Sequence, residues 1–267
     1  MSDLDSPDGP LRYEVSRHVG TITMNRPKQL NALTVEVQRG MVEAVESAND
    51  NKEVRVVVLK SAGDKAFCVG RDLKETQDHS GHQGPPNDAL AMRGIYRNVF
   101  EALLESNKPT VVGMFGHTLG GGAELALACD VRFAAANLSF GFPEATLGLG
   151  ANFASQMLPR VVPSSTAYDL LYTARRIDAE EALAIGLISR VLPSSSIHQA
   201  VSEWAAAVAA NAPLTTQRFK AMITKGRDMP LAAALRLGAG PDPYASEDRL
   251  EGTTAWMEKR RPNWKSR

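Results

Sequence analysis

Cysteine is scarce in this sequence, and neither sign of charge is in excess. Its 267 residues include two cysteines, Cys68 and Cys129, which are too few for a disulfide-stapled secreted fold or a four-cysteine zinc site. The 30 Lys and Arg residues balance the 30 Asp and Glu residues, so the formal net charge is +0. Proteins dedicated to nucleic acids usually carry a strongly basic surface, so we expect no nucleic-acid partner.

Long apolar runs are absent as well. No run reaches the roughly 18 residues that a membrane-spanning helix needs. Residues 1–10 are acidic and contain two prolines, without the basic and apolar regions of a secretory signal peptide. With 43% hydrophobic and 22% charged residues, the composition is that of an ordinary globular protein. We therefore expect a cytoplasmic protein with no membrane partner.

Signatures of several common enzyme classes are also missing. The sequence has no Gly-x-x-x-x-Gly-Lys-Ser/Thr phosphate loop, no Gly-x-Ser-x-Gly nucleophile elbow, and no His-Glu-x-x-His or Cys-x-x-Cys metal motif. Gly148-Leu149-Gly150 begins a dinucleotide-binding fingerprint, but Phe153 stands where its third glycine belongs. We set aside nucleoside-triphosphate, serine-hydrolase, nicotinamide and zinc chemistry, and expect neither a metal nor a separate cofactor.

Strand and helix patterns alternate in the first part of the chain. Short apolar runs, several of them β-branched, predict strands at 19–24, 54–59, 110–114, 131–134 and 138–142. Helical spacing of apolar residues predicts helices at 33–51 and 91–106, a short helix after Gly122, and helical structure alone from about Pro163, ending with 246–260. The order of these elements indicates an α/β fold with a helical C-terminal region.

Residues 76–90 interrupt this alternation. They contain histidines, glycines and prolines but almost no apolar side chains. We predict a surface loop that is poorly ordered without ligand, because little apolar surface anchors it.

Three glycines, 120–122, directly follow a predicted buried strand and open a helix. Without side chains, their backbone N–H groups can closely approach a ligand oxygen at the positive end of that helix. A carbonyl oxygen that becomes an oxyanion is one suitable occupant. A tight strand-to-helix turn packed against a neighbouring segment explains the triplet equally well.

Two glutamates follow in apolar surroundings. Glu124 lies next to Leu125, and Glu144 follows Phe142 and Pro143. Two partly buried carboxyl groups with displaced pKa values are suited to move protons to and from carbon and water. The alternative is that Glu124 is an ordinary acidic residue of a first helical turn and Glu144 a solvated loop residue.

A third segment, 67–74, follows the predicted strand 54–59 through a glycine-containing turn. A second backbone N–H donor could come from this segment. An ordinary loop, with Cys68 as a small buried apolar residue, is the alternative.

Together and in this order, these segments resemble the enoyl-CoA hydratase/isomerase (crotonase) superfamily. The resemblance extends over nearly the whole chain. The blocks that carry it are 22–33, 67–74, 113–130, 142–144 and 246–262.

The resemblance implies a crotonase-like spiral of β-β-α turns. We expect this core, with the acyl-CoA site, at 1–195 and a helical trimerisation region at 196–267. Such proteins form homotrimers, often dimers of trimers. Independently, the apolar residues of the C-terminal third exceed what a small appendage can bury, which also predicts trimers or hexamers.

The same resemblance implies a substrate and a site. The substrate is an acyl-CoA thioester whose oxygen lies between the N–H groups of Arg71 and Gly121, with Glu124 and Glu144 as the acid/base pair that adds water to a trans-2-enoyl-CoA. Residues expected to contact CoA or the substrate are Lys28, Val69, Gly70, Asp72, Leu73, Lys74 and Gly120. For the lysines, solvated surface charge is the alternative.

The two glutamates differ in their sequence surroundings. Because the helix N-terminus favours an ionised carboxylate, we assign Glu124 to activate water toward C3. Because apolar neighbours favour the protonated form, we assign Glu144 to deliver a proton to C2. The resemblance points the same way.

Two departures from the family pattern concern the acyl pocket. Arg71 stands where a small residue is usual, and Asn152 and Phe153 replace small residues after the second glutamate. They leave open a hydratase or isomerase for a branched, cyclic or aromatic enoyl-CoA. A CoA- or RNA-binding protein without turnover, using the basic residues at the C-terminus, is the alternative from another class.

Overall fold

The computed structural model describes residues 8–78 and 97–267. The predicted loop 76–90 lies outside these residues from position 79 onward. Its first three positions belong to the short helix α2 (Leu73–Asp78), so the prediction of a loop is wrong for 76–78.

Most strands form one sheet of six. Its strands, in spatial order, are β1 (Leu11–Ser16), β2 (Val19–Met24), β3 (Val56–Ser61), β5 (Thr110–Met114), β7 (Val131–Ala135) and β10 (Arg190–Leu192). β1 and β2 are antiparallel, and every later pairing in the sheet is parallel. Sequential strands running parallel require the chain to cross over between them, and helices and short strands fill these crossovers.

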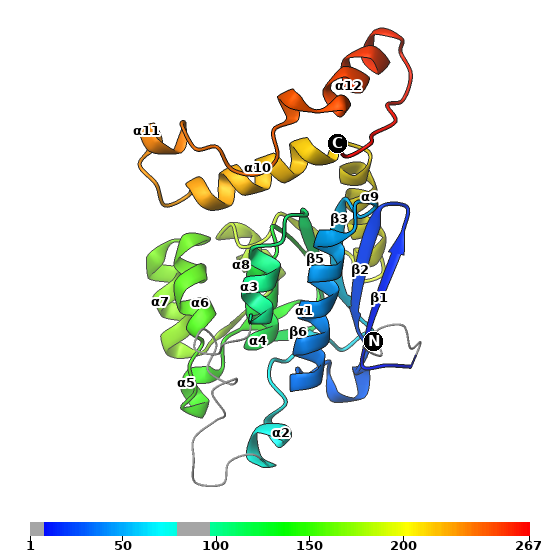
Figure 1. The fold of residues 1–267 in the computed structure, drawn as a ribbon. Helices are drawn as coiled ribbons and strands as arrows, with labels where there is room; N and C mark the ends of the chain where they lie inside the picture. The colour runs from blue at the N-terminus through cyan, green and yellow to red at the C-terminus, as the bar shows by residue number, and fades with distance from the viewer. Residues whose placement is uncertain (1–7, 79–96) are drawn as a thin grey trace.

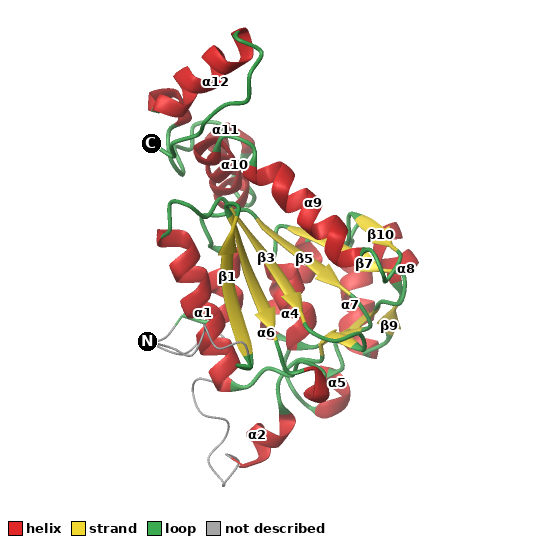
Figure 2. Cartoon of the chain, turned by 90° about the vertical axis from the view of Figure 1, so that its right-hand side faces the viewer, coloured by secondary structure: helices red, strands yellow, loops and turns green. Residues whose placement is uncertain are grey.

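The central strands are buried on both faces, as their continuous apolar runs predict. Val57 and Leu59 face a core that contains Met41 of α1 (Val35–Asp50). Val56 and Val58 face the opposite core, which α9 (Ile197–Ala209) covers. Figure 2 shows α1 and α9 on opposite sides of the strands.

A smaller sheet lies beyond the ends of the large one. Its strands, in spatial order, are β4 (Ala66–Cys68), β6 (His117–Leu119), β8 (Ser139–Gly141) and β9 (Arg176–Ile177). Each of β3, β5 and β7 is followed along the chain by one of these short strands and then by a helix. The repeated β-β-α unit confirms the predicted spiral α/β fold.

Helices occupy the interior and one edge of the spiral. After α2 they are α3 (Val99–Leu104), α4 (Gly121–Ala128), α5 (Glu144–Leu147), α6 (Asn152–Met157), α7 (Ser164–Thr173) and α8 (Ala179–Ala184). In the described part of the chain, short 3-10 turns occur at Pro27–Gln29, Leu158–Arg160 and Pro243–Ala245. Figure 1 places α4 between the strands and α3, close to the centre of the molecule.

Three sequence predictions need correction. The chain after Pro163 is not helical alone, because β9 and β10 add strands to both sheets. They are two and three residues long, too short to show an alternation. The helix predicted at 91–106 begins at Val99, because Asn98 is extended and caps it through its side chain. Residues 91–96 lie outside the described part, and β1 was not predicted at all.

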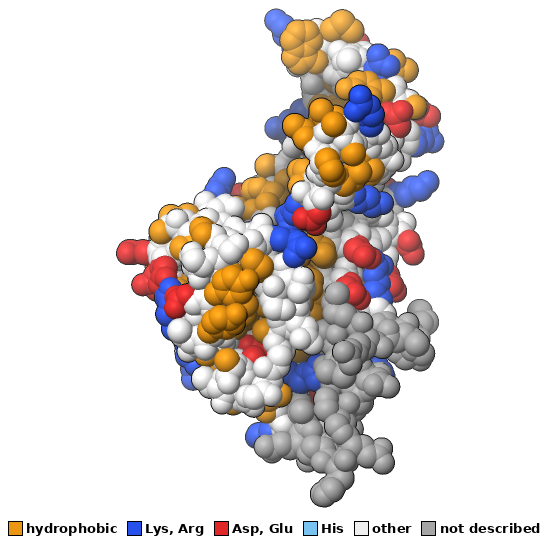
Figure 3. All heavy atoms as spheres, turned by 90° about the vertical axis from the view of Figure 1, so that its left-hand side faces the viewer, with side chains coloured by type: hydrophobic (Ala, Val, Ile, Leu, Met, Phe, Trp, Pro, Cys, Tyr) orange, Lys and Arg blue, Asp and Glu red, His pale blue; other side chains and the backbone are white. Residues whose placement is uncertain are grey.

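The last helices extend away from the sheets. Figure 1 shows α10 (Pro213–Gly226), α11 (Leu231–Ala234) and α12 (Glu247–Met257) above the body of the molecule. The C-terminal residues then return to the core, where Arg55 donates to the Trp264 carbonyl at 3.3 Å. Large apolar side chains remain exposed on this arm, including Trp256 at 82% and Leu235 at 75%. Figure 3 shows hydrophobic side chains gathered there.

Candidate active site

The turn between β6 and α4 brings a carboxyl group against the backbone. Gly120 follows β6 with φ 53° and ψ −126°, a conformation that glycine adopts far more readily than other residues. A Cβ atom at this position would lie 2.7 Å from Oε1 of Glu144. Glycine is therefore required here both by the backbone conformation and by the approach of Glu144.

Two backbone N–H groups lie side by side where this turn meets the segment after β4. Gly70 has φ +87°, and a Cβ atom there would lie 2.9 Å from the backbone nitrogen of Gly121. A Cβ atom on Gly121 would lie 3.8 Å from the backbone nitrogen of Arg71. The two turns thus touch backbone to backbone, which brings the N–H groups of Arg71 and Gly121 together.

The orientation of these groups follows from their neighbours. Leu33 N–H donates to the Gly70 carbonyl at 2.8 Å, and Asp72 N–H donates to the Leu33 carbonyl at 2.9 Å. In such a parallel bridge the intervening residue, Arg71, turns its own N–H away from Leu33. Gly121 begins α4, and the first N–H groups of a helix have no acceptor within it. Both groups are suited to bind an oxygen that gains negative charge.

Glu124 lies one helical turn after this point and is buried, with 7% of its surface exposed. Its Oε1 accepts a hydrogen bond of 2.9 Å from the backbone N–H of Ala154, in the first turn of α6. The amide of Phe153 also favours the ionised carboxylate. The N-terminal end of α6 therefore holds the Glu124 side chain in one orientation.

Burial nevertheless dominates the ionisation of Glu124. Burial is the largest cause that raises the pKa of Glu124, and the charge of Glu144 adds to it. The amides of α6 and the charge of Arg71 oppose this rise, and the resulting pKa is about 7. We expected the helix N-terminus to keep Glu124 readily ionised. This prediction was wrong, because it underestimated how far burial raises the pKa. Desolvation of a carboxylate inside the protein outweighs the helix dipole here.

Glu144 is half-buried at the first position of α5. Burial raises the pKa of Glu144 as well. Within the described residues, its buried Oε2 atom has no hydrogen-bond partner. A buried carboxyl oxygen without a partner favours the protonated form, as the sequence predicted, and is available to a ligand.

Phe153 and Asn152 take different positions in α6. The Phe153 ring is buried and stacks on Phe100 of α3, with ring centroids 5.3 Å apart. Asn152 is exposed at the start of the helix. The larger side chain at position 153 is accommodated by core packing, while its backbone stays beside Glu124.

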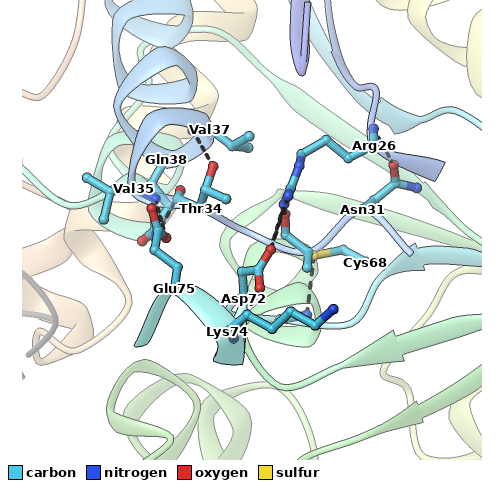
Figure 4. Close-up of polar contacts among 12 residues, drawn as sticks. Arg26, Asn31, Thr34, Val35, Val37, Gln38, Cys68, Asp72, Lys74 and Glu75 are labelled. Atoms are coloured by element: carbon cyan, nitrogen blue, oxygen red, sulfur yellow. Dashed lines mark hydrogen bonds and ion pairs between the residues drawn. The ribbon is translucent and has the colours of Figure 1, made fainter. Parts of the chain in front are cut away.

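The other predicted contact residues divide into four groups. Val69 and Gly70 lie in the segment that meets Gly121. Lys28 lines a surface pocket of about 220 Å³ together with Asp64 and Lys65. Leu73 and Lys74 are exposed at the start of α2. Asp72 turns its carboxylate toward Arg26 (Figure 4), so an ion pair accounts for it better than a contact with CoA.

Sequence reasoning gave no role to Arg26 and Asn31. Asn31 is 1% exposed and donates from Nδ2 to the carbonyls of Ala62 and Ala66, both at 2.9 Å. Arg26 and Asn31 both lie in the block 22–33, which matches the family pattern, and this match was the available sequence signal that they have a role. The partner of Arg26 lies 46 positions away, and no local pattern indicates such a pairing.

Across 8–78 and 97–267, no three His, Cys, Asp or Glu side chains are grouped so that they could hold a metal ion. In the same residues, every helix is too short or too polar to cross a membrane.

Comparison with known proteins places the chain in a family. A profile of the family described as enoyl-CoA hydratase/isomerase matches residues 14–267. The chain is 36% identical over 262 residues to (E)-benzylidenesuccinyl-CoA hydratase of Thauera aromatica, covering 95% of this chain and 98% of the relative. It is 35% identical over 246 residues to short-chain-enoyl-CoA hydratase of Clostridium acetobutylicum, covering 91% and 92%. The structure of enoyl-CoA hydratase from Bacillus anthracis superimposes with a TM-score of 0.87 at 31% identity, covering 97% of this chain and 100% of that one.

Proposed function

The chain belongs to the enoyl-CoA hydratase/isomerase family, and on that premise we propose that it is an enoyl-CoA hydratase. It adds water across the C2–C3 double bond of a trans-2-enoyl-CoA and releases a 3-hydroxyacyl-CoA. The observation that carries this proposal is the pair of carboxyl groups, Glu124 and Glu144, beside two adjacent backbone N–H groups. The hydratase activity named for its relatives supports it.

Each group has a part in this reaction. The N–H groups of Arg71 and Gly121 bind the thioester oxygen and stabilise the negative charge that develops on it when water attacks C3. Glu124, oriented by the Ala154 amide, takes a proton from the water, and Glu144 delivers a proton to C2. The two carboxyl groups exchange protonation states, and a proton transfer resets them. The chemistry needs no separate cofactor.

The test follows the absorbance of the conjugated enoyl thioester for a panel of acyl chains. With crotonyl-CoA or a longer straight-chain enoyl-CoA, we expect the absorbance to fall as water adds and the conjugation is lost. CoA-ester binding without any loss of absorbance across the panel would contradict the proposal and favour binding without turnover.

A specific observation favours a second candidate substrate range. The positive charge of Arg71, a residue that departs from the family pattern, acts to lower the pKa of Glu124 against the larger rise that burial causes. This is consistent with an acyl group that is bulkier or more polar than a straight chain, and one similar protein is named as a hydratase of (E)-benzylidenesuccinyl-CoA. Aromatic and branched members of the absorbance panel decide between the two ranges.

We also propose that the chain assembles into trimers or hexamers through 196–267. Phe219, Leu231 and Trp256 are each more than half exposed on the C-terminal arm. A closed symmetric oligomer is an ordinary way to bury such surfaces. Light scattering at micromolar concentration is expected to give a mass of three or six chains, and the mass of one chain would contradict this proposal.

A further inference from the structure

Asp72, the residue after Arg71, lies in a group of charged and polar side chains that includes Arg26 and Asn31 (Figure 4). The Arg26 guanidinium donates through both terminal nitrogens to Oδ2 of Asp72, each at 3.1 Å. One of these nitrogens also donates to the Ala32 carbonyl at 2.7 Å. Both side chains are mostly shielded, with 20% and 15% of their surfaces exposed. Arg26 therefore joins Asp72 to the residue that precedes Leu33.

These contacts enclose Arg71 from two directions. Asp72 follows Arg71 directly, and Leu33 forms the parallel bridge with Arg71. Arg26 contacts both segments of this bridge: it donates to the Asp72 carboxylate on one segment and to the carbonyl of Ala32, the neighbour of Leu33, on the other. The backbone of Arg71 cannot shift relative to Leu33 without disturbing the Arg26–Asp72 pair.

Asn31 extends the same network toward β4. Its Oδ1 accepts from the Arg26 backbone N–H at 3.0 Å, while its Nδ2 group donates to the carbonyls of Ala62 and Ala66. Because Ala66 begins β4, the strand that leads into Gly70 and Arg71 is held from the same centre. The network thus connects the end of β2, the start of β4 and the segment that carries the N–H donor.

We propose that Arg26 and Asp72 are positioning residues that set the place of the Arg71 N–H donor for hydration. Neither side chain needs to touch the substrate for this role. A donor stabilises an oxyanion only within hydrogen-bond distance, and a displacement of about 1 Å can reduce the rate on the order of 10²-fold. The inference rests on the proposed function, because it requires Arg71 N–H to bind the thioester oxygen.

The first measurement is the steady-state kinetics of Asp72→Ala, Asp72→Asn and Arg26→Met. We expect Asp72→Ala and Arg26→Met each to lower kcat about 10- to 100-fold, with KM changed much less. Asp72→Asn keeps an acceptor for Arg26 and should recover part of the loss. The double variant Arg26→Met/Asp72→Ala should lose little more than either single variant, since both substitutions remove the same ion pair.

Glu75→Gln is the matched control. Glu75 lies three positions after Asp72, and its Oε2 accepts from Val35 N–H at the start of α1, at 3.0 Å. Figure 4 shows this contact beside the Arg26–Asp72 pair. Glutamine keeps an acceptor there, so kcat should stay near the wild-type value. An equal loss in Glu75→Gln would mean that general loosening of the segment explains the effect and would overturn the proposal.

The second measurement tests the Arg71 N–H donor directly, through the absorbance of a bound thioester. Cinnamoyl-CoA is bound to proteins that carry Glu124→Gln, which blocks its hydration, with and without Asp72→Asn or Asp72→Ala. Donors on the thioester oxygen polarise the conjugated chromophore and move its absorbance to longer wavelength. We expect the Asp72 variants to lose part of that shift while still binding the ligand.

The outcomes separate this proposal from the proposed function. Lower kcat with an unchanged bound spectrum, or kcat within about twofold of wild type in Asp72→Ala, overturns the positioning role. If Asp72→Ala does not fold, Arg26→Met is judged by the same two criteria. If the wild-type chain hydrates no enoyl-CoA, the proposed function fails before any of these variants is compared.

Discussion

Glu124→Gln and Glu144→Gln are each expected to lower kcat for hydration by about 10²- to 10⁴-fold, the usual value of a positioned general acid or base. Glutamine has nearly the same shape as glutamate, but it can neither take a proton from water nor give one to C2. In Glu124→Gln the side-chain oxygen can still accept from Ala154 N–H, so the local structure should persist. The loss then reflects chemistry, and the two variants should be comparable in size.

Binding of the product thioester separates chemistry from recognition. The proposed oxygen ligands are backbone N–H groups that neither substitution removes, so affinity for a 3-hydroxyacyl-CoA should change little. Glu43→Gln, an exposed position of α1, serves as a control that should keep full activity. If either site variant hydrates its best substrate at nearly the wild-type rate, the mechanism with two carboxyl groups is wrong.

Glu124→Gln is also expected to stabilise the folded protein in alkaline solution. Burial raises the pKa of Glu124 from its ordinary value of 4.5 to about 7, so between these values the folded chain holds a proton that the unfolded chain has released. Wild-type stability therefore falls as pH rises through this window, whereas glutamine has no proton to lose. A shift of this size corresponds to about 3 kcal/mol in the free energy of unfolding.

Urea unfolding at pH 4.5 and pH 8 measures this difference. The stability of Glu124→Gln relative to wild type should increase by about 3 kcal/mol from the lower to the higher pH. The exposed control Glu43→Gln should show no comparable change. An equal difference at both pH values would show that burial does not penalise the Glu124 carboxylate.

The fold was predictable from sequence where strands are long and strongly apolar. The strands at Val19–Met24 and Thr110–Met114 have the predicted bounds. Thr110–Met114 is buried along its whole length, and Val19–Met24 is a β-branched and apolar segment that ends before the polar Asn25. β9 and β10 could not be predicted, because two or three residues show no periodicity and their pairing partners lie far away in the sequence. Leu33 was assigned to the apolar stripe of a helix, but the helix begins after Thr34 and Leu33 pairs with Arg71 instead.

The candidate site was predictable in its residues and less so in its electrostatics. The three glycines and two glutamates stand out as residue types, and the family pattern orders them. The apolar residues next to Glu124 indicate partial burial, but the depth of that burial depends on packing by α6, which lies far from Glu124 in the sequence. The pair of Arg26 and Asp72 escaped notice for a related reason, since opposite charges 46 positions apart are commonplace in any sequence.

The order in which the strands occur along the chain has a consequence for synthesis. All groups of the candidate site, from Arg26 to Ala154, precede α7, so a chain growing from its N-terminus contains the whole site well before its last helices are made. At that stage β7 and β8 are the outer strands of their sheets, because β10 and β9 have yet to be added. Unpaired strand edges are the surfaces through which unfinished chains pair with one another. Two short strands with no part in the chemistry therefore close the edges through which a nascent chain, already complete in its active site, is most prone to aggregate.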